Sequence, residues 1–435
     1  MSFPLRSTFR RTALASALTL VAGLSAAAPA QAAPPRPAPS LAPAPLPAPV
    51  AIGPGLFGLH INDPLAHYPT APFGTVRLWD SGTTWRDLQP TPTTYDFTRL
   101  DAQVARLRAA RKDIVMVLGV TPQWASKRPT EAGNYGPGTA AEPKDIRTWR
   151  AYVRKLALRY KGKITKWELY NEPNVKLFFS GQPKDMLALS REAWTQLKAV
   201  DRNNYVISPG VAIRTDNSPK WLDTYLALGG GKYSNAIAVH FYVRARQRPE
   251  HTIGYLAIVR KIMAARGVSK QPLWNTESGY GRATTDVRTN EIYTGNTAMA
   301  YVARTYVLMA AGNVARSYWY GWDHRGFTGL YLTEPDQRTA TAAGKAYGVT
   351  YKWLVGARIS GCVLQKTGTL TGGYICSLLR GRDRVQILWH PDVTRPIRVP
   401  VGFRSIQRLD GSKKPLRAGS VLSIGPLPVL ISTAP

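Results

Sequence analysis

Two glutamates in this sequence of 435 residues lie where carboxyl groups can do acid–base chemistry. Glu172 ends the run Trp-Glu-Leu-Tyr-Asn-Glu, and Glu277 ends the run Leu-Trp-Asn-Thr-Glu. Each run has the apolar and aromatic composition of a buried β-strand. A carboxyl group that keeps its proton and a second one that stays ionised can together break a glycosidic bond. The first protonates the leaving oxygen and the second stabilises or attacks the anomeric carbon.

The elements that must position these glutamates are predicted by eight apolar runs that alternate with amphipathic stretches. The strands are expected at 56–61, 75–79, 114–118, 165–170, 205–208, 236–241, 272–276 and 315–320. Helices are expected at 101–111, 183–200, 252–266, 290–311 and 341–354, with one more capped by Asp145. Eight such units predict a (β/α)8 barrel, or TIM barrel, of the α/β class. A doubly wound open sheet is the alternative, but no glycine-rich phosphate loop follows the first strand.

Composition divides the chain into four segments. Residues 1–32 have a basic start, an alanine-rich apolar stretch and a small-residue cleavage pattern, which predicts an export signal peptide. Residues 33–54 are rich in proline and alanine and are expected to form a linker. The barrel is expected over 55–340, and the last helix with a small C-terminal β-sandwich over 341–435. We therefore expect a secreted or periplasmic protein without a membrane span.

A closed barrel brings the two glutamates together, because its reacting groups lie at the carboxyl ends of the strands. Glu172 ends the fourth predicted strand and Glu277 the seventh, so they face each other across the mouth of the barrel. Arg77 ends the second strand and is a candidate to keep one of the two carboxyl groups ionised. His60 and Trp124 follow the first and third strands and are candidates for sugar contacts.

Asn171-Glu172-Pro173 at the fourth strand, with Glu277 at the seventh, resembles clan A of the retaining glycoside hydrolases. Gly58-Leu59-His60 and the loop 121–125 are most similar to glycoside hydrolase family 39 and related bacterial exopolysaccharide hydrolases. The resemblance implies that Glu172 is the acid/base and Glu277 the nucleophile of a double displacement without metal or organic cofactor. It also implies substrate-binding roles for Asn171, Arg77, His240, Tyr242, and Trp319 or Trp322.

Each of these assignments has a structural alternative. Arg77 can belong to a structural ion pair, His240 can satisfy backbone groups, and His60 can be a core residue. Trp124, Trp319 and Trp322 can be packing residues, as most of the twelve tryptophans must be. Glu168 is interpreted as a surface charge or a member of a buried ion pair. The sequence has neither the histidine spacing of metallohydrolases nor a Gly-x-Ser-x-Gly elbow, which disfavours both classes.

The formal net charge is +31, which favours acidic partners. Scattered charges without a recognised motif disfavour nucleic acid, so a polysaccharide or oligosaccharide substrate, possibly acidic, is expected, and an arginine-rich coding bias is the alternative. Arg244-Ala245-Arg246-Gln247-Arg248 follows the sixth strand and is hypothesised to bind an anionic substrate group, with a solvated loop as the alternative. Cys362 and Cys376 are expected to form a disulfide. A non-catalytic carbohydrate-binding or polyanion-binding envelope protein is the competing function.

Overall fold

A computed structural model describes residues 49–214 and 217–435 of the chain. The predicted signal peptide and most of the predicted linker lie outside these residues. No helix in the described ranges is both long enough and apolar enough to cross a bilayer.

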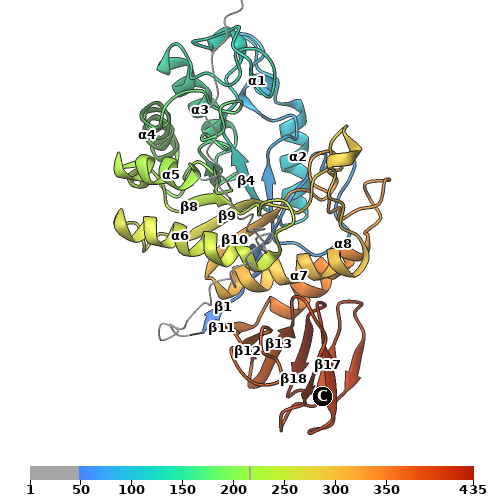
Figure 1. The fold of residues 1–435 in the computed structure, drawn as a ribbon. Coiled ribbons are helices and arrows are strands. Elements are labelled where there is room, and N and C mark those ends of the chain that lie inside the picture. Colours follow the sequence, from blue (N-terminus) through green and yellow to red (C-terminus); the bar gives the residue numbers. More distant parts are fainter. Residues whose placement is uncertain (1–48, 215–216) are drawn as a thin grey trace, which may run out of the picture. The chain divides into compact units, whose positions relative to one another are not determined.

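Parallel strands form the central sheet of the molecule (Figure 1). Their bounds are β2 (Phe57–His60), β3 (Thr75–Leu78), β4 (Asp113–Val117), β5 (Lys166–Glu168), β6 (Tyr205–Ile207), β7 (Val211–Ala212), β8 (Ile237–His240), β9 (Leu273–Ser278) and β10 (Val314–Trp319). The sheet order is β6-β5-β4-β3-β2-β10-β9-β8-β7. Nearly all of these strand residues are buried, as in parallel sheets covered on both faces.

The sheet closes on itself because β6 and β7, at the two ends of this order, are consecutive pieces of one strand. β6 pairs with β5, and β7 pairs with β8. A parallel bridge between Ile207 and Ala236 joins the end of β6 directly to the start of β8. β6 and β7 together fill the fifth of eight strand positions. The predicted (β/α)8 barrel is therefore confirmed.

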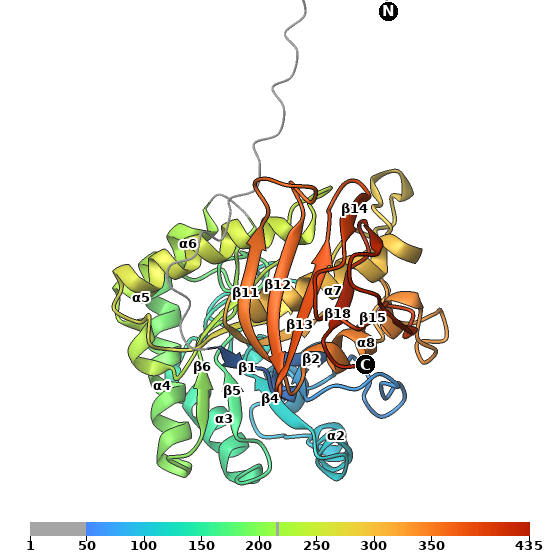
Figure 2. The ribbon, with the colours of Figure 1, turned by 90° about the horizontal axis from the view of Figure 1, so that it is seen from below.

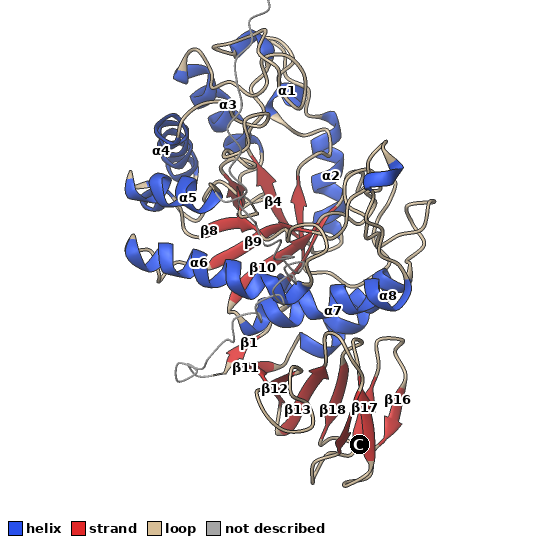
Figure 3. Ribbon diagram, in the orientation of Figure 1, coloured by secondary structure: helices blue, strands red, loops and turns tan. Residues whose placement is uncertain are grey.

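Helices surround the barrel strands (Figure 3). They are α1 (Trp85–Leu88), α2 (Thr98–Ala109), α3 (Ile146–Arg159), α4 (Pro183–Val200), α5 (Ser218–Ala227), α6 (Thr252–Ala265), α7 (Gly295–Ala311) and α8 (Ala342–Leu354). α3 begins at the predicted cap, where the Asp145 carboxylate accepts a hydrogen bond from the Arg147 amide. Its buried residues Trp149, Val153 and Leu156 follow helical spacing on one face. α1 and α5 are too short or too irregular to have been predicted.

The C-terminal part of the chain forms two antiparallel sheets. The strands are β1 (Val50–Ala51), β11 (Arg358–Leu364), β12 (Tyr374–Arg380), β13 (Asp383–Trp389), β14 (Arg395–Arg398), β15 (Ser405–Gln407), β16 (Lys413–Pro415), β17 (Val421–Ile424) and β18 (Val429–Ser432). The larger sheet has the order β1-β11-β12-β13-β18-β15-β16, and Figure 2 shows its central strands side by side. β14 and β17 pair separately and share an apolar core with it that includes Ile397, Phe403, Leu422 and Ile431. This is the predicted β-sandwich.

One disulfide and one additional strand pair stabilise the larger sheet of the sandwich. Cys362 and Cys376 lie opposite each other in β11 and β12 and form the predicted disulfide. β1 pairs with β11, so Val50 and Ala51, at the end of the predicted linker, belong to this sheet.

Charged and polar side chains connect the barrel to the sandwich. The buried Glu250 carboxylate, in the turn η4 (Pro249–His251), accepts a hydrogen bond of 2.8 Å from the Trp389 indole. Glu250 also lies 3.5 Å from the guanidinium of Arg304, whose Nε donates to the Pro426 carbonyl at 3.0 Å. α7 is buried on nearly every face, which explains its apolar sequence.

Candidate active site

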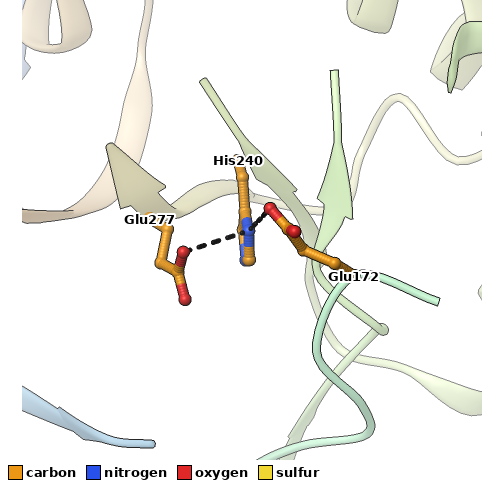
Figure 4. A group of neighbouring side chains, drawn as sticks. All are labelled: Glu172, His240 and Glu277. Carbon is orange, nitrogen blue, oxygen red and sulfur yellow. Dashed lines mark hydrogen bonds and ion pairs between the residues drawn. The ribbon is translucent and has the colours of Figure 1, made fainter. Parts of the chain in front are cut away.

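Glu172 and Glu277 lie at the carboxyl ends of two barrel strands and point toward one side chain, His240 at the end of β8 (Figure 4). Glu277 is the fifth residue of β9, and Glu172 follows β5. Both residues are about 95% buried, with exposed fractions of 4% and 5%. One oxygen of Glu172, one oxygen of Glu277 and one nitrogen of His240 lie within 4.8 Å of one another. The fold therefore brings the two predicted carboxylates to one point.

Arg77, on β3, holds this cluster together with four hydrogen bonds. Its Nη1 donates to Glu277 Oε1 at 2.6 Å, and its Nη2 donates to Asn171 Oδ1 at 2.7 Å. Its Nε and Nη2 donate to the two oxygens of Glu168 at 2.7 and 3.0 Å. Glu168 and Arg77 have no exposed surface, so Glu168 belongs to a buried ion pair and not to the solvated surface. Burial disfavours ionisation of Glu168, but the Arg77 charge outweighs it and lowers the pKa of this carboxyl group.

His240 lies between the three carboxylates. Its Nδ1 is 2.9 Å from Glu172 Oε1 and 3.5 Å from Glu277 Oε2, and its Nε2 is 3.9 Å from Glu168 Oε1. Burial disfavours the imidazolium ion, but the charge of Glu277 and the contacts with Glu168 and Glu172 raise the pKa of His240 to about 9. The ring therefore carries a proton at neutral pH and shares it with Glu172.

The two glutamates have different electrostatic surroundings. Burial raises the pKa of Glu277, although the charges of His240 and Arg77 oppose this effect. Its Oε2 also accepts a hydrogen bond of 2.9 Å from the Tyr242 hydroxyl. For Glu172, the hydrogen bond and charge of His240 outweigh burial and lower the pKa. Arg77 contacts Glu277 as predicted, but it does not bring the pKa of Glu277 below the ordinary value.

The backbone at Glu172 is also unusual. This residue has φ of 42°, in the left-handed region that side chains other than glycine rarely adopt, and its amide donates to the Gly210 carbonyl at 2.8 Å. Gly210 itself has no room for a side chain. A Cβ there would lie 2.5 Å from both Glu168 Oε1 and His240 Nε2, so only glycine fits beneath the cluster.

His60, Tyr320 and Asp80 lie next to one another beside this cluster. The sequence analysis named His60 but missed Tyr320 and Asp80. His60 is fully buried, and neither ring nitrogen has a hydrogen-bond partner among the described residues. Its ring lies 4.4 Å from that of Tyr320, whose hydroxyl donates to Asp80 Oδ2 at 2.9 Å. The Asp80 carboxylate also accepts a hydrogen bond from the Tyr135 hydroxyl. Asp80 lies two residues after the end of β3, so a search for polar residues near every strand end would have found it.

The structure does not show an exposed ring face at Trp319 or Trp322, the predicted substrate contacts after the eighth strand. Trp319 and Trp322 are both fully buried in the main core, so neither exposes a ring face to a sugar. Trp319 packs against Tyr280, with ring centroids 5.8 Å apart. The next residue along, Tyr320, lies on the catalytic side of the strand end. Trp124 donates its indole N–H to the Gln89 carbonyl at 3.0 Å and packs edge-on against Trp85, and the structure does not bring it to the cluster.

Glu172, His240 and Glu277 are also a group whose ligand atoms lie close enough to hold a metal ion. The Arg77 guanidinium is 2.6 Å from Glu277 Oε1 and places a fixed positive charge beside that position. A cation there would be repelled by Arg77, so the donor set fits a metal poorly.

Residues 143–347 match the family model described as the glycosyl hydrolase catalytic core. This match identifies the protein as a glycosidase. The matched region of this glycosidase runs from before α3 to α8 and includes Glu172, His240 and Glu277. No curated protein sequence matches the chain.

Solved structures of glycoside hydrolases share the fold of this glycosidase. A family 39 enzyme from Bacteroides cellulosilyticus WH2 is 19% identical with a TM-score of 0.65, over 86% of this chain and 80% of that one. A family 39 β-xylosidase from Caulobacter crescentus is 16% identical with a TM-score of 0.63, over 90% and 98% of the two chains. A family 30 endoxylanase from Clostridium papyrosolvens is 11% identical with a TM-score of 0.60, over 88% and 97%. The shared fold agrees with the predicted resemblance to clan A and family 39.

Proposed function

We propose that this glycosidase cleaves O-glycosidic bonds of a polysaccharide or oligosaccharide with retention of configuration, using Glu172 and Glu277. The observation that carries the proposal is that one oxygen of each carboxyl group lies within 4.8 Å of the other. Retaining enzymes separate their two carboxyl groups by about 5–5.5 Å, whereas inverting enzymes need about 6.5–9.5 Å to admit a water molecule.

Glu277 acts as the nucleophile in this proposal. Arg77 donates to its Oε1 and Tyr242 to its Oε2, so the carboxylate is held in one orientation by two hydrogen bonds. Glu277 attacks the anomeric carbon and forms a glycosyl ester while the bond to the leaving oxygen breaks. Tyr242 and Arg77 keep the carboxylate in position for this attack and leave it little freedom to rotate.

Glu172 acts as the acid and then as the base. The proton it needs comes from His240, whose pKa is raised to about 9 and whose Nδ1 lies 2.9 Å from Glu172 Oε1. Movement of that proton to Glu172 leaves a neutral imidazole and a carboxylic acid that protonates the leaving oxygen. In the second step water attacks the anomeric carbon, Glu172 takes the water proton, and Glu277 is released as a carboxylate.

Four other side chains are proposed to bind the reacting sugar. The Asn171 carbonyl oxygen accepts from Arg77, which turns the amide nitrogen outward as a donor for a sugar hydroxyl. His60 has two buried ring nitrogens without a partner among the described residues, and a sugar hydroxyl would satisfy one of them. Tyr320 and Asp80 adjoin His60 and can present an aromatic face and a carboxylate acceptor.

We also propose that the protein is exported. The sequence of residues 1–32 predicts a signal peptide, and the Cys362–Cys376 disulfide suits an oxidising compartment. A polysaccharide outside the cytoplasm is then the expected substrate. The competing function, a protein that binds carbohydrate without cleaving it, is disfavoured because the two carboxylates, Arg77 and the shared proton are all in place.

Release of reducing ends from a panel of neutral and acidic polysaccharides tests the proposal, with purified Glu172→Gln and Glu277→Gln variants alongside. Removal of a positioned acid or base costs roughly 10²–10⁴-fold in rate, and removal of the nucleophile should cost at least as much. The Glu192→Gln variant, altered on the surface helix α4, is the matched control and should keep wild-type activity. Cleavage by either active-site variant at the wild-type rate would refute the assignment.

A further inference from the structure

A pocket of about 440 Å³ adjoins the catalytic cluster and shares one wall with it, the ring of Tyr242. Tyr242 donates its hydroxyl to Glu277 on one side and lines the pocket on the other. The remaining walls come from the segments that follow β7, β8, β9 and β10. All four segments leave the carboxyl ends of barrel strands, so the pocket opens on the catalytic face. Its volume lies in the range of small-molecule sites, about 300–1,000 Å³.

Three arginines from three different segments line this pocket: Arg214 after β7, Arg244 after β8 and Arg282 after β9. The Arg214 guanidinium lies over the rings of Tyr242 and Phe327, at 5.3 and 5.8 Å from their centroids. Arg244 donates its Nε to the Arg214 backbone carbonyl at 3.1 Å. The two rings lie at 87° to each other, so they hold the Arg214 guanidinium from two sides by cation–π contacts, and its N–H groups can donate to an anion.

Two of the three arginines, Arg214 and Arg282, have no close carboxylate partner in the part of the chain that the structure describes. Among the described residues, no carboxylate lies within 4.0 Å of the Arg214 or Arg282 guanidinium. Of the lining residues that the structure describes, Glu291 alone is acidic, and its Oε1 accepts hydrogen bonds from the Arg246 amide and the Tyr293 hydroxyl. Elsewhere on the barrel, arginines such as Arg128 and Arg266 form close pairs with carboxylates. The charge of Arg214 also reaches the catalytic cluster, where it helps to lower the pKa of Glu172.

Only part of the basic segment 244–248 lines this pocket. Arg248 pairs with Asp392 of the sandwich, and Arg246 does not line the pocket. Of the three arginines in this segment, Arg244 alone lines the pocket, and the other two pocket arginines, Arg214 and Arg282, come from loops that the sequence did not connect with it.

We infer that this pocket binds an anionic sugar unit, through its carboxylate or sulfate group, next to the bond that is cleaved. The inference rests on the proposed function for the position of the cleaved bond. Two oxygens of a carboxylate or sulfate group accept paired hydrogen bonds from the Arg214 guanidinium, while Arg282 adds positive charge at the opening. The arginines of this pocket would then select acidic glycans at the subsite beside Tyr242.

Isothermal titration calorimetry on the Glu277→Gln variant tests this inference without turnover. Three matched pairs of oligosaccharides serve as probes. They are oligogalacturonate and its carboxyl-reduced form, oligoglucuronate and the corresponding cello-oligosaccharide, and a carrageenan oligosaccharide and its desulfated form. The carboxylate and sulfate pairs distinguish the two possible anions. Titrations at low and high salt measure the electrostatic share of the binding.

We expect at least one acidic probe to bind about tenfold more tightly than its neutral counterpart, since charge-assisted pairs are strong. Arg214→Gln and Arg282→Gln should each remove most of that difference, and Arg246→Gln, two residues from Arg244 but outside the pocket, should preserve it. Arg282 is exposed, so its substitution does not threaten the fold. Equal binding within every pair, no binding of any acidic probe, or an equal loss in Arg246→Gln would overturn the inference. The reducing-end assay with Glu172→Gln and Glu277→Gln reports separately on the proposed function.

Discussion

Replacement of Glu168 by glutamine should lower the free energy of unfolding and shift the pH optimum of activity, although Glu168 does not face the substrate. Glu168 accepts two hydrogen bonds from Arg77 and one of 3.1 Å from the Thr276 hydroxyl, and it has no exposed surface. A glutamine keeps one acceptor oxygen but turns an NH₂ group toward an arginine donor. Breaking a buried ion pair costs about 3–5 kcal/mol. Arg77 keeps its hydrogen bond to Glu277 and one bond to the glutamine. We therefore expect the free energy of unfolding to fall by about 3 kcal/mol, the lower end of this range.

This loss has a defined pH dependence. The folded-state pKa of Glu168 lies below its ordinary value of 4.5, so its ionised form stabilises the folded state above that value. The difference in free energy of unfolding between wild type and variant should be full at pH 7 and should shrink as the pH falls through the folded-state pKa. Total stabilities of about 5–15 kcal/mol leave the variant folded at neutral pH.

The catalytic pH limits should move as well. Removal of the negative charge of Glu168 lowers the pKa of Glu277, which must be ionised to attack, so activity should begin at a lower pH. Glu168 also helps to raise the pKa of His240, so loss of the shared proton should begin at a lower pH. Both limits of kcat/KM therefore shift to lower pH.

Urea denaturation and a pH profile of kcat/KM measure these effects. Glu192→Gln is the matched control, because Glu192 pairs with the exposed Arg150 on the protein surface at 2.7 Å. Surface pairs contribute about 0–1 kcal/mol, so this control should change little. A loss of stability in Glu168→Gln no larger than that of the control, or unchanged pH limits, would refute the account of the buried network.

Three further predictions follow from the same contacts. The wild-type profile of kcat/KM should be bell-shaped, rising with pH as Glu277 ionises above 4.5 and falling near 9 as His240 and Glu172 lose their shared proton, and a rate that is constant from pH 4 to 10 would contradict this. Asp80→Asn should lower kcat/KM roughly 10–100-fold, the value of one charge-assisted hydrogen bond, and should also move the acid limit to lower pH because the Asp80 charge raises the pKa of Glu277; an unchanged profile would remove Asp80 from the site. Glu250→Gln should lower the free energy of unfolding by roughly 1–3 kcal/mol, because it leaves the buried Arg304 without its charge partner, while kcat stays constant; a fall in kcat with unchanged stability would contradict a purely structural role.

The sequence allowed the barrel and the centre of the site to be predicted, because both depend on patterns that are local in the chain. Strands and helices alternate at regular spacing, and the two glutamates end strands four and seven of any eight-stranded barrel. Arg77, His240 and Tyr242 end neighbouring strands, so they reach the glutamates once the barrel closes.

The aromatic residue that the eighth strand presents to the cluster could not be predicted, because it depends on the register of one buried strand. Residues 318–320 are Tyr-Trp-Tyr and all are buried, so no polar alternation indicates which side chain faces the barrel interior. Tyr318 packs with interior residues such as Val115, and Trp319 packs in the outer core toward the helices. A shift of one residue therefore gives Tyr320, and not Trp319, to the site.

Contacts between segments that are far apart in the chain could not be predicted from the sequence either. β1 has two residues and forms only because β11 offers its edge more than 300 positions later. The arginine pocket combines residues from the segments after four strands, and Tyr242 and Phe327 supply its aromatic contacts with Arg214. Spacing along the chain does not encode such convergence.

The central claim, that Glu172 and Glu277 act on one sugar ring by double displacement, is tested most directly by the anomeric configuration of the first product. Proton NMR during the first minutes of cleavage, on whichever panel substrate is degraded, resolves the two anomers before they interconvert. Carboxyl oxygens within 4.8 Å predict a product with the configuration of the substrate. A first product of inverted configuration would contradict the account.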